Sequence, residues 1–458
     1  MSSALRTKSR QTPGRHDGAV PRYRGGSWSE CALPTRAEAW PKFGTRALRD
    51  LSGDDYDITR EDLRTYSQGK IWVWPAEHIF FLCDVHADTE AFLRCLVATG
   101  GIERTGAGDT EYALTEVGRS ATFVIGGDCF DKGPENLRLL RALGGLIDKG
   151  ARVEILAGNH DVRALLGLAY AGEKSPRTAH LWVRMGKKSI PLFREIYDQY
   201  LTSMNGRIEY PTDEEVRARL FPPESWFDEF PAVAAGLILP QKIEREIVRI
   251  REKMVELVER AAEMGMTLGQ VYVATQLAQR LFLQPNGEFR WFFERMRLAR
   301  RAGSFLMIHA GVDDETAALI HSHGVEGLND RFRELVEEDL WELYHGPVGN
   351  AFRTKYRDAD LPLTEGGTEL MHRSGIYAIV HGHKNLLRGP RLTMRRGILN
   401  VECDSSVDCN TRRLEGLAGP GAAALVIRPD GQMIALSVDY PYAKVFTSSR
   451  NLHMVIQT

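Results

Sequence analysis

Residue types that bind metal ions recur in this sequence directly after short apolar runs. Residues 79–83 lead into Asp84 and His86, and residues 121–125 lead through two glycines to Asp128. The pattern returns three times: Asn159 follows residues 153–157, His309 follows residues 305–308, and His381 and His383 follow residues 377–380. Carboxylate, amide and imidazole groups that meet at one place can bind a metal ion.

The spacing within these clusters favours a site for metal ions. Asp84 and His86 are two positions apart in an extended stretch, so their side chains point to the same side and can chelate one ion. Asp128 follows a different run, and its two carboxylate oxygens can bridge two ions. Oxygen and imidazole ligands without a thiolate favour Mn, Fe or Zn. A lone Asp-x-His pair is often accidental, but five such clusters in order predict a metal site.

The apolar runs themselves predict the elements that bring these residues together. Each run is short and rich in β-branched or aromatic residues, which is typical of a strand buried on both faces. Ligands of open α/β sheets gather just past the carboxyl ends of such strands. Helices are predicted between the strands, over residues 89–99, 137–147 and 162–170. The sequence therefore predicts an α/β fold.

The strand and helix alternation stops between residues 171 and 302. Helices are predicted there over residues 241–266, 266–284 and 289–301, the first with apolar residues at three- and four-residue steps. We interpret this segment as a helical cap inserted into the core; the alternative is a helical part of the core itself. The predicted organisation is a polar, partly disordered N-terminal extension (1–68), two core halves (69–170 and 303–458) and the insertion (171–302).

Composition narrows the range of partners and compartments. The 458 residues carry a net charge near −2, which gives no support for bulk binding to nucleic acid or to an anionic membrane. No apolar run approaches the length that spans a membrane. The six cysteines include no Cys-x-x-Cys pair, which favours a reducing compartment. A cytoplasmic protein is therefore the expectation.

Five motifs, taken in order, resemble the signature blocks of the calcineurin-like metallophosphoesterases. They are Asp84-x-His86, Gly127-Asp128-x-x-Asp131-Lys132-Gly133, Gly158-Asn159-His160-Asp161, His309-Ala310-Gly311 and His381-Gly382-His383. The second motif is similar to that of the serine/threonine protein phosphatase branch and its bacterial relatives. The resemblance covers about residues 79–404, interrupted by the insertion. It implies a four-layer αββα core around two metal ions.

The resemblance also implies a role for each site residue. One ion would be bound by Asp84, His86, Asp128 and His383, and the other by Asp128, Asn159, His309 and His381. His160 would be the catalytic acid, oriented by Asp131. Lys132 and Arg163 would neutralise charge on the phosphate, although Arg163 could equally be a surface residue in a salt bridge. Cys83 and Ala87 replace glycines usual in the family, Lys132 replaces an arginine, and Lys384 replaces a small hydroxyl residue.

The expected activity is hydrolysis of a phosphate monoester, in a phosphoprotein or a small molecule. In such sites two ions hold a bridging hydroxide that attacks phosphorus in line with the leaving oxygen. Lys132 is a point charge where an arginine could bind phosphate in a bidentate way, so the substrate class stays open. The alternatives are a phosphodiesterase or dinucleoside-polyphosphate hydrolase, and an inactive binding scaffold. The complete ligand set and the His160–Asp131 pair argue against the scaffold.

Overall fold

Two β-sheets form the centre of the computed structural model, which describes residues 18–25, 30–41, 56–204 and 206–457. The larger sheet has the order β1 (Ala37–Ala39), β17 (Ala443–Thr447), β16 (Gln432–Ser437), β15 (Ala423–Ile427), β4 (Ile79–Leu82), β7 (Thr122–Ile125), β8 (Arg152–Leu156) and β9 (Met296–Arg297). The smaller has the order β10 (Ala299–Ala302), β11 (Phe305–Ile308), β12 (Ala378–His381), β14 (Ile398–Glu402), β13 (Arg391–Arg395) and β2 (Tyr56–Asp57). Two short ribbons pair β3 (Ile71–Trp74) with β18 (Met454–Gln457), and β5 (Ile102–Arg104) with β6 (Tyr112–Leu114).

The strands predicted to carry the ligands lie side by side and run parallel. In the larger sheet β4, β7 and β8 are parallel neighbours, and in the smaller sheet β11, β12 and β14 are. Their carboxyl ends therefore open at one edge of each sheet, as the pattern of apolar runs predicts. The described parts of the N-terminal extension join these sheets through β1 and β2. The disorder predicted for the first residues falls largely outside the described residues.

Side chains alternate between the two faces of the larger sheet. Phe81 and Val124 point into the sandwich, where they share one apolar cluster with Phe305 of the other sheet. Phe80 points outward and packs with its ring centroid 5.0 Å from that of Phe123. A strand buried on both faces reads as an uninterrupted apolar run, and each such side chain contributes about 1.5–3 kcal/mol on burial.

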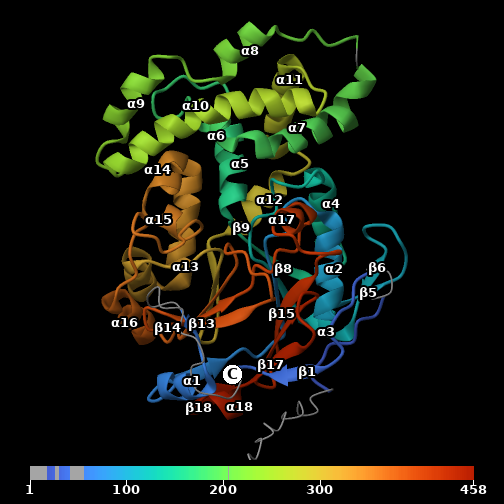
Figure 1. The fold of residues 1–458 in the computed structure, drawn as a ribbon, viewed down its shortest axis with the longest axis vertical. Helices are drawn as coiled ribbons and strands as arrows, with labels where there is room; N and C mark the ends of the chain where they lie inside the picture. Colours follow the sequence, from blue (N-terminus) through green and yellow to red (C-terminus); the bar gives the residue numbers. More distant parts are fainter. Residues whose placement is uncertain (1–17, 26–29, 42–55, 205, 458) are drawn as a thin grey trace, which may run out of the picture.

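Helices cover the outer faces of both sheets, and the four-layer αββα fold predicted from the sequence is confirmed (Figure 1). One outer layer comprises α2 (Thr89–Thr99), α3 (Glu116–Ser120) and α4 (Asn136–Asp148). The other comprises α13 (Asp314–Glu338), interrupted at Gly324, and α16 (Glu365–Arg373). The remaining core helices are α1 (Arg60–Tyr66), α5 (Asn159–Ala169), α14 (Leu340–His345), α15 (Pro347–Asn350), α17 (Cys409–Leu414) and α18 (Ser448–Asn451).

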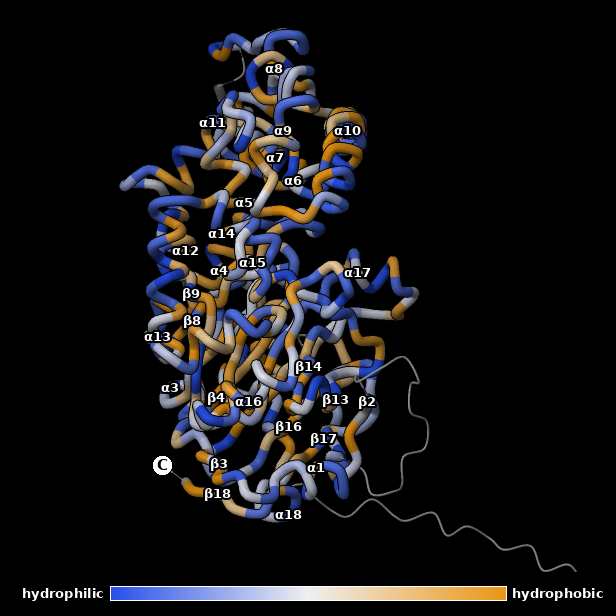
Figure 2. Tube along the Cα trace, turned by 90° about the vertical axis from the view of Figure 1, so that its left-hand side faces the viewer, coloured by the Kyte–Doolittle hydropathy of each residue, from blue (hydrophilic) through white to orange (hydrophobic). Residues whose placement is uncertain are grey.

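A lobe of helices stands at one end of the molecule (Figure 1). It contains α6 (Leu181–Met185), η1 (Lys187–Ser189), α7 (Ile190–Ile196), η2 (Tyr197–Leu201), η3 (Thr202–Met204), α8 (Asp213–Leu220), α9 (Trp226–Ala234), α10 (Pro240–Glu263) and α11 (Leu268–Leu283). Helix α5 extends from the core to this lobe. Figure 2 shows α10 of the lobe and α17 of the core on the same side of the molecule. As a separate domain, the 171–302 insertion stays a prediction.

The helix predicted over residues 289–301 is wrong in its second half. Helix α12 (Arg290–Arg295) ends early, and β9 and β10 follow it as edge strands of the two sheets. The amide side chain of Asn329 on α13 explains this, because its Oδ1 accepts hydrogen bonds from the backbone N–H groups of Leu298 and Ala299, both at 3.0 Å. A long-range contact of this kind overrides the local helical pattern.

No helix in the described part of the chain is long and apolar enough to cross a membrane.

A buried lysine ties α10 to the end of α6. Lys253 Nζ donates a hydrogen bond to the backbone oxygen of Arg184 at 3.0 Å. Gly186 has a φ of +74°, and a Cβ there would meet Lys253 Nζ at 2.3 Å, so only glycine fits this turn. Burial, followed by the charges of Arg184 and Arg163, lowers the pKa of Lys253 to about 6. The lysine is therefore neutral in the folded protein at neutral pH.

Replacing this lysine should change how stability depends on pH. Between a folded pKa of about 6 and an unfolded value near 10.5, the unfolded chain binds the extra proton, so the free energy of unfolding rises with pH. Lys253→Met removes that rise. We expect its stability relative to wild type to be greatest near pH 6 and to fall by up to about 1.4 kcal/mol per pH unit up to pH 9.

Urea denaturation at a series of pH values measures this difference. Lys187→Met, which removes an exposed lysine of the same region, serves as the control and should give a curve parallel to that of wild type. Parallel curves for Lys253→Met and wild type would mean that Lys253 keeps its proton in the folded state.

Candidate metal centre

The predicted site residues stand in strained loops just past the strand ends. Asp84 and His86 follow β4, Asp128 follows β7, and His383 follows β12; all four have a positive φ, between 44° and 67°. Ala87, at a position where the family usually has glycine, also has a positive φ of 52°. Residues with side chains adopt this region at a cost of order 1–3 kcal/mol each, and such strain clusters at functional sites. The strain aims these side chains into one space.

Asp128 lies between two groups of imidazoles. Its Oδ2 is 3.8 Å from His86 Nε2 and 4.0 Å from His160 Nε2. Its Oδ1 is 3.5 Å from His309 Nε2, and that nitrogen is 3.3 Å from Asn159 Oδ1. The two oxygens of one carboxylate thus face two separate sets of ligand atoms.

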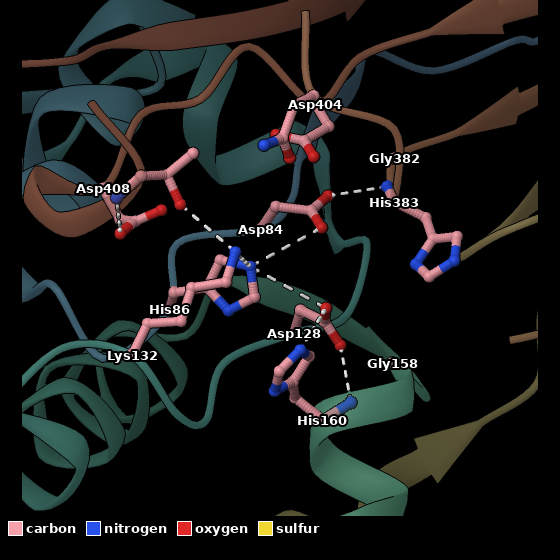
Figure 3. Close-up of polar contacts among 12 residues, drawn as sticks. Asp84, His86, Asp128, Lys132, Gly158, His160, Gly382, His383, Asp404 and Asp408 are labelled. Atoms are coloured by element: carbon pink, nitrogen blue, oxygen red, sulfur yellow. Dashed lines mark hydrogen bonds and ion pairs between the residues drawn. The ribbon is translucent and has the colours of Figure 1, made fainter. Parts of the chain in front are cut away.

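Asp84 and His383 occupy the side of the centre opposite Asp128 (Figure 3). Asp84 Oδ2 accepts a hydrogen bond from the backbone N–H of His383 at 3.1 Å, and Asp84 Oδ1 is 3.9 Å from His86 Nε2. The ring of His383 groups with Asp128 and His309, with ligand atoms within 4.8 Å of one another. The family resemblance would instead place His383 on one ion with Asp84 and His86. The structure differs from that expectation, because it groups His383 with His309.

His381 is fully buried at the end of β12, beside the centre. Its Nδ1 lies 3.0 Å from the Gly382 carbonyl oxygen, and its Nε2 lies 3.9 Å from Glu402 Oε1. Among the residues that the structure describes, this Nε2 has no hydrogen-bond partner, and His381 belongs to neither group of converging ligand atoms. Among the predicted carboxylate and histidine ligands in the described residues, His381 and Asp84 are therefore the two that belong to neither group.

His160 and Asp131 form a close pair beside Asp128. Their Nδ1 and Oδ2 atoms are 2.7 Å apart, which leaves Nε2 of the imidazole facing the centre. Burial lowers the pKa of His160, and the charge of Arg163 lowers it further. Burial raises the pKa of Asp131 to about 6. The pair has the geometry of a histidine whose position is set by a carboxylate.

Lys132 reaches the centre from the loop after β7. Its Nζ is 2.6 Å from His86 Nε2 and donates a hydrogen bond to Thr411 Oγ1 at 3.2 Å (Figure 3). The side-chain amide of Asn410 donates to the Lys132 backbone oxygen at 2.8 Å, so α17 holds this loop. Lys132 therefore lies where it can meet a ligand of the centre.

The charges and donors of this site fit a metal ion. Burial and the charge of Asp128 raise the pKa of Asp84 to about 7, and burial raises the pKa of Asp404 well above its usual value. Buried carboxylates repel one another unless a cation offsets their charge. Imidazole and carboxylate oxygen donors, with no thiolate among them, suit Mn, Fe or Zn. Burial also lowers the pKa of His86, which keeps the imidazole in the neutral form that a metal requires.

A cavity of about 900 Å³ lies over the centre, between the core and the helical lobe. Its floor includes Asp84, His86 and Asp128, and Arg163 lines it one helical turn beyond His160. Arg163 forms no salt bridge within 4.0 Å in the described residues, and its buried Nε has no hydrogen-bond partner there. The alternative of a surface residue in a salt bridge is therefore wrong.

Other lining residues were missed by sequence reasoning. Asp404 stands beside Asp84 (Figure 3) and follows β14, so the rule of strand ends that found the other ligands could have found it. Lys188 and Tyr344 come from segments with no strand pattern, so no local signal marks them. Burial raises the pKa of Tyr344, but the guanidiniums of Arg184, Arg163 and Arg353 outweigh burial and lower this pKa to about 8. Three guanidinium groups thus act on this tyrosine of the cavity wall.

This chain is similar to known phosphoesterases in sequence and to solved phosphatases in structure. The family model of the calcineurin-like phosphoesterases matches residues 78–244, from the start of β4 into α10. No curated protein matches the sequence. Similar solved structures include a cold-active protein tyrosine phosphatase, with 13% identity over 86% of this chain and 85% of that chain and a TM-score of 0.45.

Two further structures extend this set. One is the cold-active protein-tyrosine phosphatase of a psychrophilic Shewanella species, with 14% identity over 90% of this chain and 89% of that chain and a TM-score of 0.41. The other is a protein serine/threonine phosphatase from Saccharomyces cerevisiae, with 11% identity over 81% of each chain and a TM-score of 0.34. The family match supports the resemblance that the motifs predict: residues 78–244, which contain the first three of the five motifs, match the calcineurin-like phosphoesterase model.

Proposed function

We propose that this protein hydrolyses phosphate monoesters at a centre that holds two metal ions. One observation carries this proposal: the two carboxylate oxygens of Asp128 face separate sets of ligand atoms, with His86 on one side and His309 on the other. A carboxylate in this position can bridge two ions. The family match supports a phosphoesterase, and the cavity over the centre has room for a phosphate ester.

The ions would be held by residues from both sheets. Asp84 and His86 lie on one side of Asp128, and Asn159, His309 and His383 lie on the other. His381, also expected from the family resemblance, is buried beside the centre but outside both groups of ligand atoms. When bound, Mn, Fe or Zn ions polarise phosphate oxygens and activate the attacking water. An ion on His86 would displace the Lys132 ammonium from that nitrogen, and Lys132 would then be available to the phosphate.

His160 is the proposed proton donor to the leaving group. Its Nδ1 is held by Asp131 at 2.7 Å, so its Nε2 is presented to the cavity side of Asp128. The nearby cations disfavour the protonated imidazole, and a phosphate dianion bound among them offsets that effect. His160 can then hold the proton that the departing alkoxide needs.

A panel of substrates tests the proposed activity. The protein is stripped of metal, reloaded with Mn²⁺, Fe²⁺ or Zn²⁺, and assayed with phosphate monoesters, a phosphodiester and a dinucleoside polyphosphate. Faster turnover of monoesters, dependent on metal, is the expected result. Faster turnover of the diester or polyphosphate would favour the alternative activity, and no turnover at all would favour a binding scaffold.

Asp128→Asn should lose bound metal and nearly all activity, because the amide keeps one neutral oxygen and cannot bridge two cations. Metal content is measured by mass spectrometry and folding by circular dichroism. Asp148→Asn, an exposed residue at the end of α4, is the control and should bind metal as wild type does. Two ions still bound at full occupancy to Asp128→Asn would contradict the bridging assignment.

His160→Ala should keep its metal ions but lose roughly 10²–10⁴ in rate on alkyl phosphates, the range for general acid catalysis. The loss should be smaller on p-nitrophenyl phosphate, whose leaving group hardly needs a proton. Asp131→Asn should show the same dependence on leaving group with a smaller loss, because it only positions the imidazole. Equal losses of His160→Ala on both substrates would mean that His160 has another role.

Lys132→Met distinguishes the substrate classes. A monoester dianion has a free terminal oxygen that an ammonium can stabilise, whereas a diester has one charge fewer and a bulky group in that place. We expect kcat/KM for monoesters to fall by about 2–4 kcal/mol in transition-state stabilisation, and that for a diester to fall clearly less. Lys187→Met is the control. An equal decrease for both classes would show that Lys132 does not contact the phosphate.

A further inference from the structure

Several cations that line the cavity have no carboxylate partner. Lys132, Arg163 and Lys188 all line it, and none of them has a carboxylate within 4.0 Å in the described residues. Other cations of the lining are paired: Arg184 with Glu246 at 2.7 Å, Lys187 with Glu256 at 3.2 Å and Arg260 with Glu263 at 3.0 Å. Four more lining cations are also without a carboxylate within 4.0 Å in the described residues: Arg353, Lys355, Arg357 and Arg413. Among the unpaired cations, Lys132, Arg163 and Lys188 lie close enough together for their charges to act on one another.

These three cations lie close enough together to repel one another. Lys188 faces the cavity, and the surrounding walls keep water from it; this desolvation, with the charges of Lys132 and Arg163, lowers its pKa. The carboxylate of Asp131, whose charge also acts on Lys188, is already paired with His160 at 2.7 Å. Mutual repulsion of this kind is relieved by a bound anion.

Hydrogen bonds within the lobe hold the short helix that carries Lys188. Lys188 lies in η1, whose Ser189 hydroxyl donates to the Gly186 carbonyl oxygen at 2.8 Å. The preceding turn is tied to α10 by the hydrogen bond from Lys253 to the Arg184 carbonyl oxygen at 3.0 Å. Arg163, from the core helix α5, contributes a buried Nε without a partner in the described residues. One donor comes from the lobe and the other from the core.

We propose that Lys188 and Arg163 form a second phosphate subsite, so that the natural substrate is a small molecule with two phosphate groups. This inference rests on the proposed function, in which Lys132 and the metal centre bind the reacting phosphate. Lys188 and Arg163 line the same cavity with no carboxylate within 4.0 Å in the described residues, so they can bind a second phosphate group. A cavity of about 900 Å³ is within the usual range for small ligands. The lobe thus selects substrates by their second charged group.

Matched substrates test this subsite. Fructose 1,6-bisphosphate is compared with fructose 6-phosphate, and adenosine 3′,5′-bisphosphate with adenosine 5′-monophosphate, as kcat/KM with the Mn²⁺-loaded protein. We expect the bisphosphate to be preferred by about tenfold or more in at least one pair, the value of one charge-assisted hydrogen bond. No preference in either pair, or faster turnover of a phosphopeptide than of both bisphosphates, would overturn the proposal.

Substitutions test whether Lys188 and Arg163 cause the preference for a bisphosphate. Lys188→Met and Arg163→Met should each lower kcat/KM for the preferred bisphosphate by about tenfold or more, and that for the matching monophosphate by less than about threefold. Lys187→Met removes the same charge from the neighbouring position and should leave both values within about twofold of wild type. Equal losses on both substrates would mean that these residues contact the reacting phosphate, which also overturns the proposal.

Binding supplies a readout that does not depend on turnover. Calorimetry with the metal-loaded His160→Ala variant should show tighter binding of the bisphosphate than of the monophosphate, and Lys188→Met in that background should abolish the difference. Hydrolysis of p-nitrophenyl phosphate by the wild-type protein distinguishes a failure of the proposed function from a failure of the second phosphate subsite. Its absence overturns the proposed function, whereas its presence without a bisphosphate preference overturns only the second subsite.

Discussion

The buried carboxylate of Asp161 holds together the loops on which the metal centre depends. Its two oxygens accept hydrogen bonds from the backbone N–H groups of Asp128 and Gly158, at 2.8 and 3.1 Å, and of Cys129 and Phe130, at 2.8 and 3.1 Å. Bonds to a charged acceptor are roughly twice as strong as neutral ones. The loops after β7 and β8 approach so closely that a Cβ on Gly158 would meet the Asp128 backbone nitrogen at 2.1 Å. Asp161 therefore fixes Asp128 between its two sets of partners.

This arrangement has a cost in stability that the sandwich must offset. Several of the predicted metal ligands have left-handed backbone conformations, and several carboxylates are buried next to one another. Both features are unfavourable without ions in place, since strain and like-charge repulsion add. Stacked apolar side chains of the two sheets, with Phe81 and Phe305 in one cluster, supply a rigid base beneath the loops. The packed strands beneath the loops help to offset the strain of the predicted ligands.

Sequence periodicity predicted the strands and the positions of most proposed ligands at their ends, and it failed where distant contacts decide the structure. An apolar run followed by Asp84 or Asp128 is a local signal, because a strand buried on both faces has to be apolar and its end has to be polar. The segment after α12 has no such signal, since Asn329 of a distant helix accepts the backbone N–H groups of Leu298, between the two strands, and of Ala299, the first residue of β10. His381 has the expected position in the chain, but the orientation of its ring depends on its contacts with Gly382 and Glu402.

The predicted reacting groups and part of the cavity wall come from different parts of the fold. Strand ends of the core provide every predicted metal ligand, the His160–Asp131 pair and Lys132. The lobe adds no predicted ligand; it contributes Lys188 and Arg184 to the wall of the cavity, through a turn that Lys253 fastens to α10. Lining residues in a segment without strands leave no periodic trace in the sequence. Pattern reading is therefore weakest for this wall, where the distances between charges are set by separate elements.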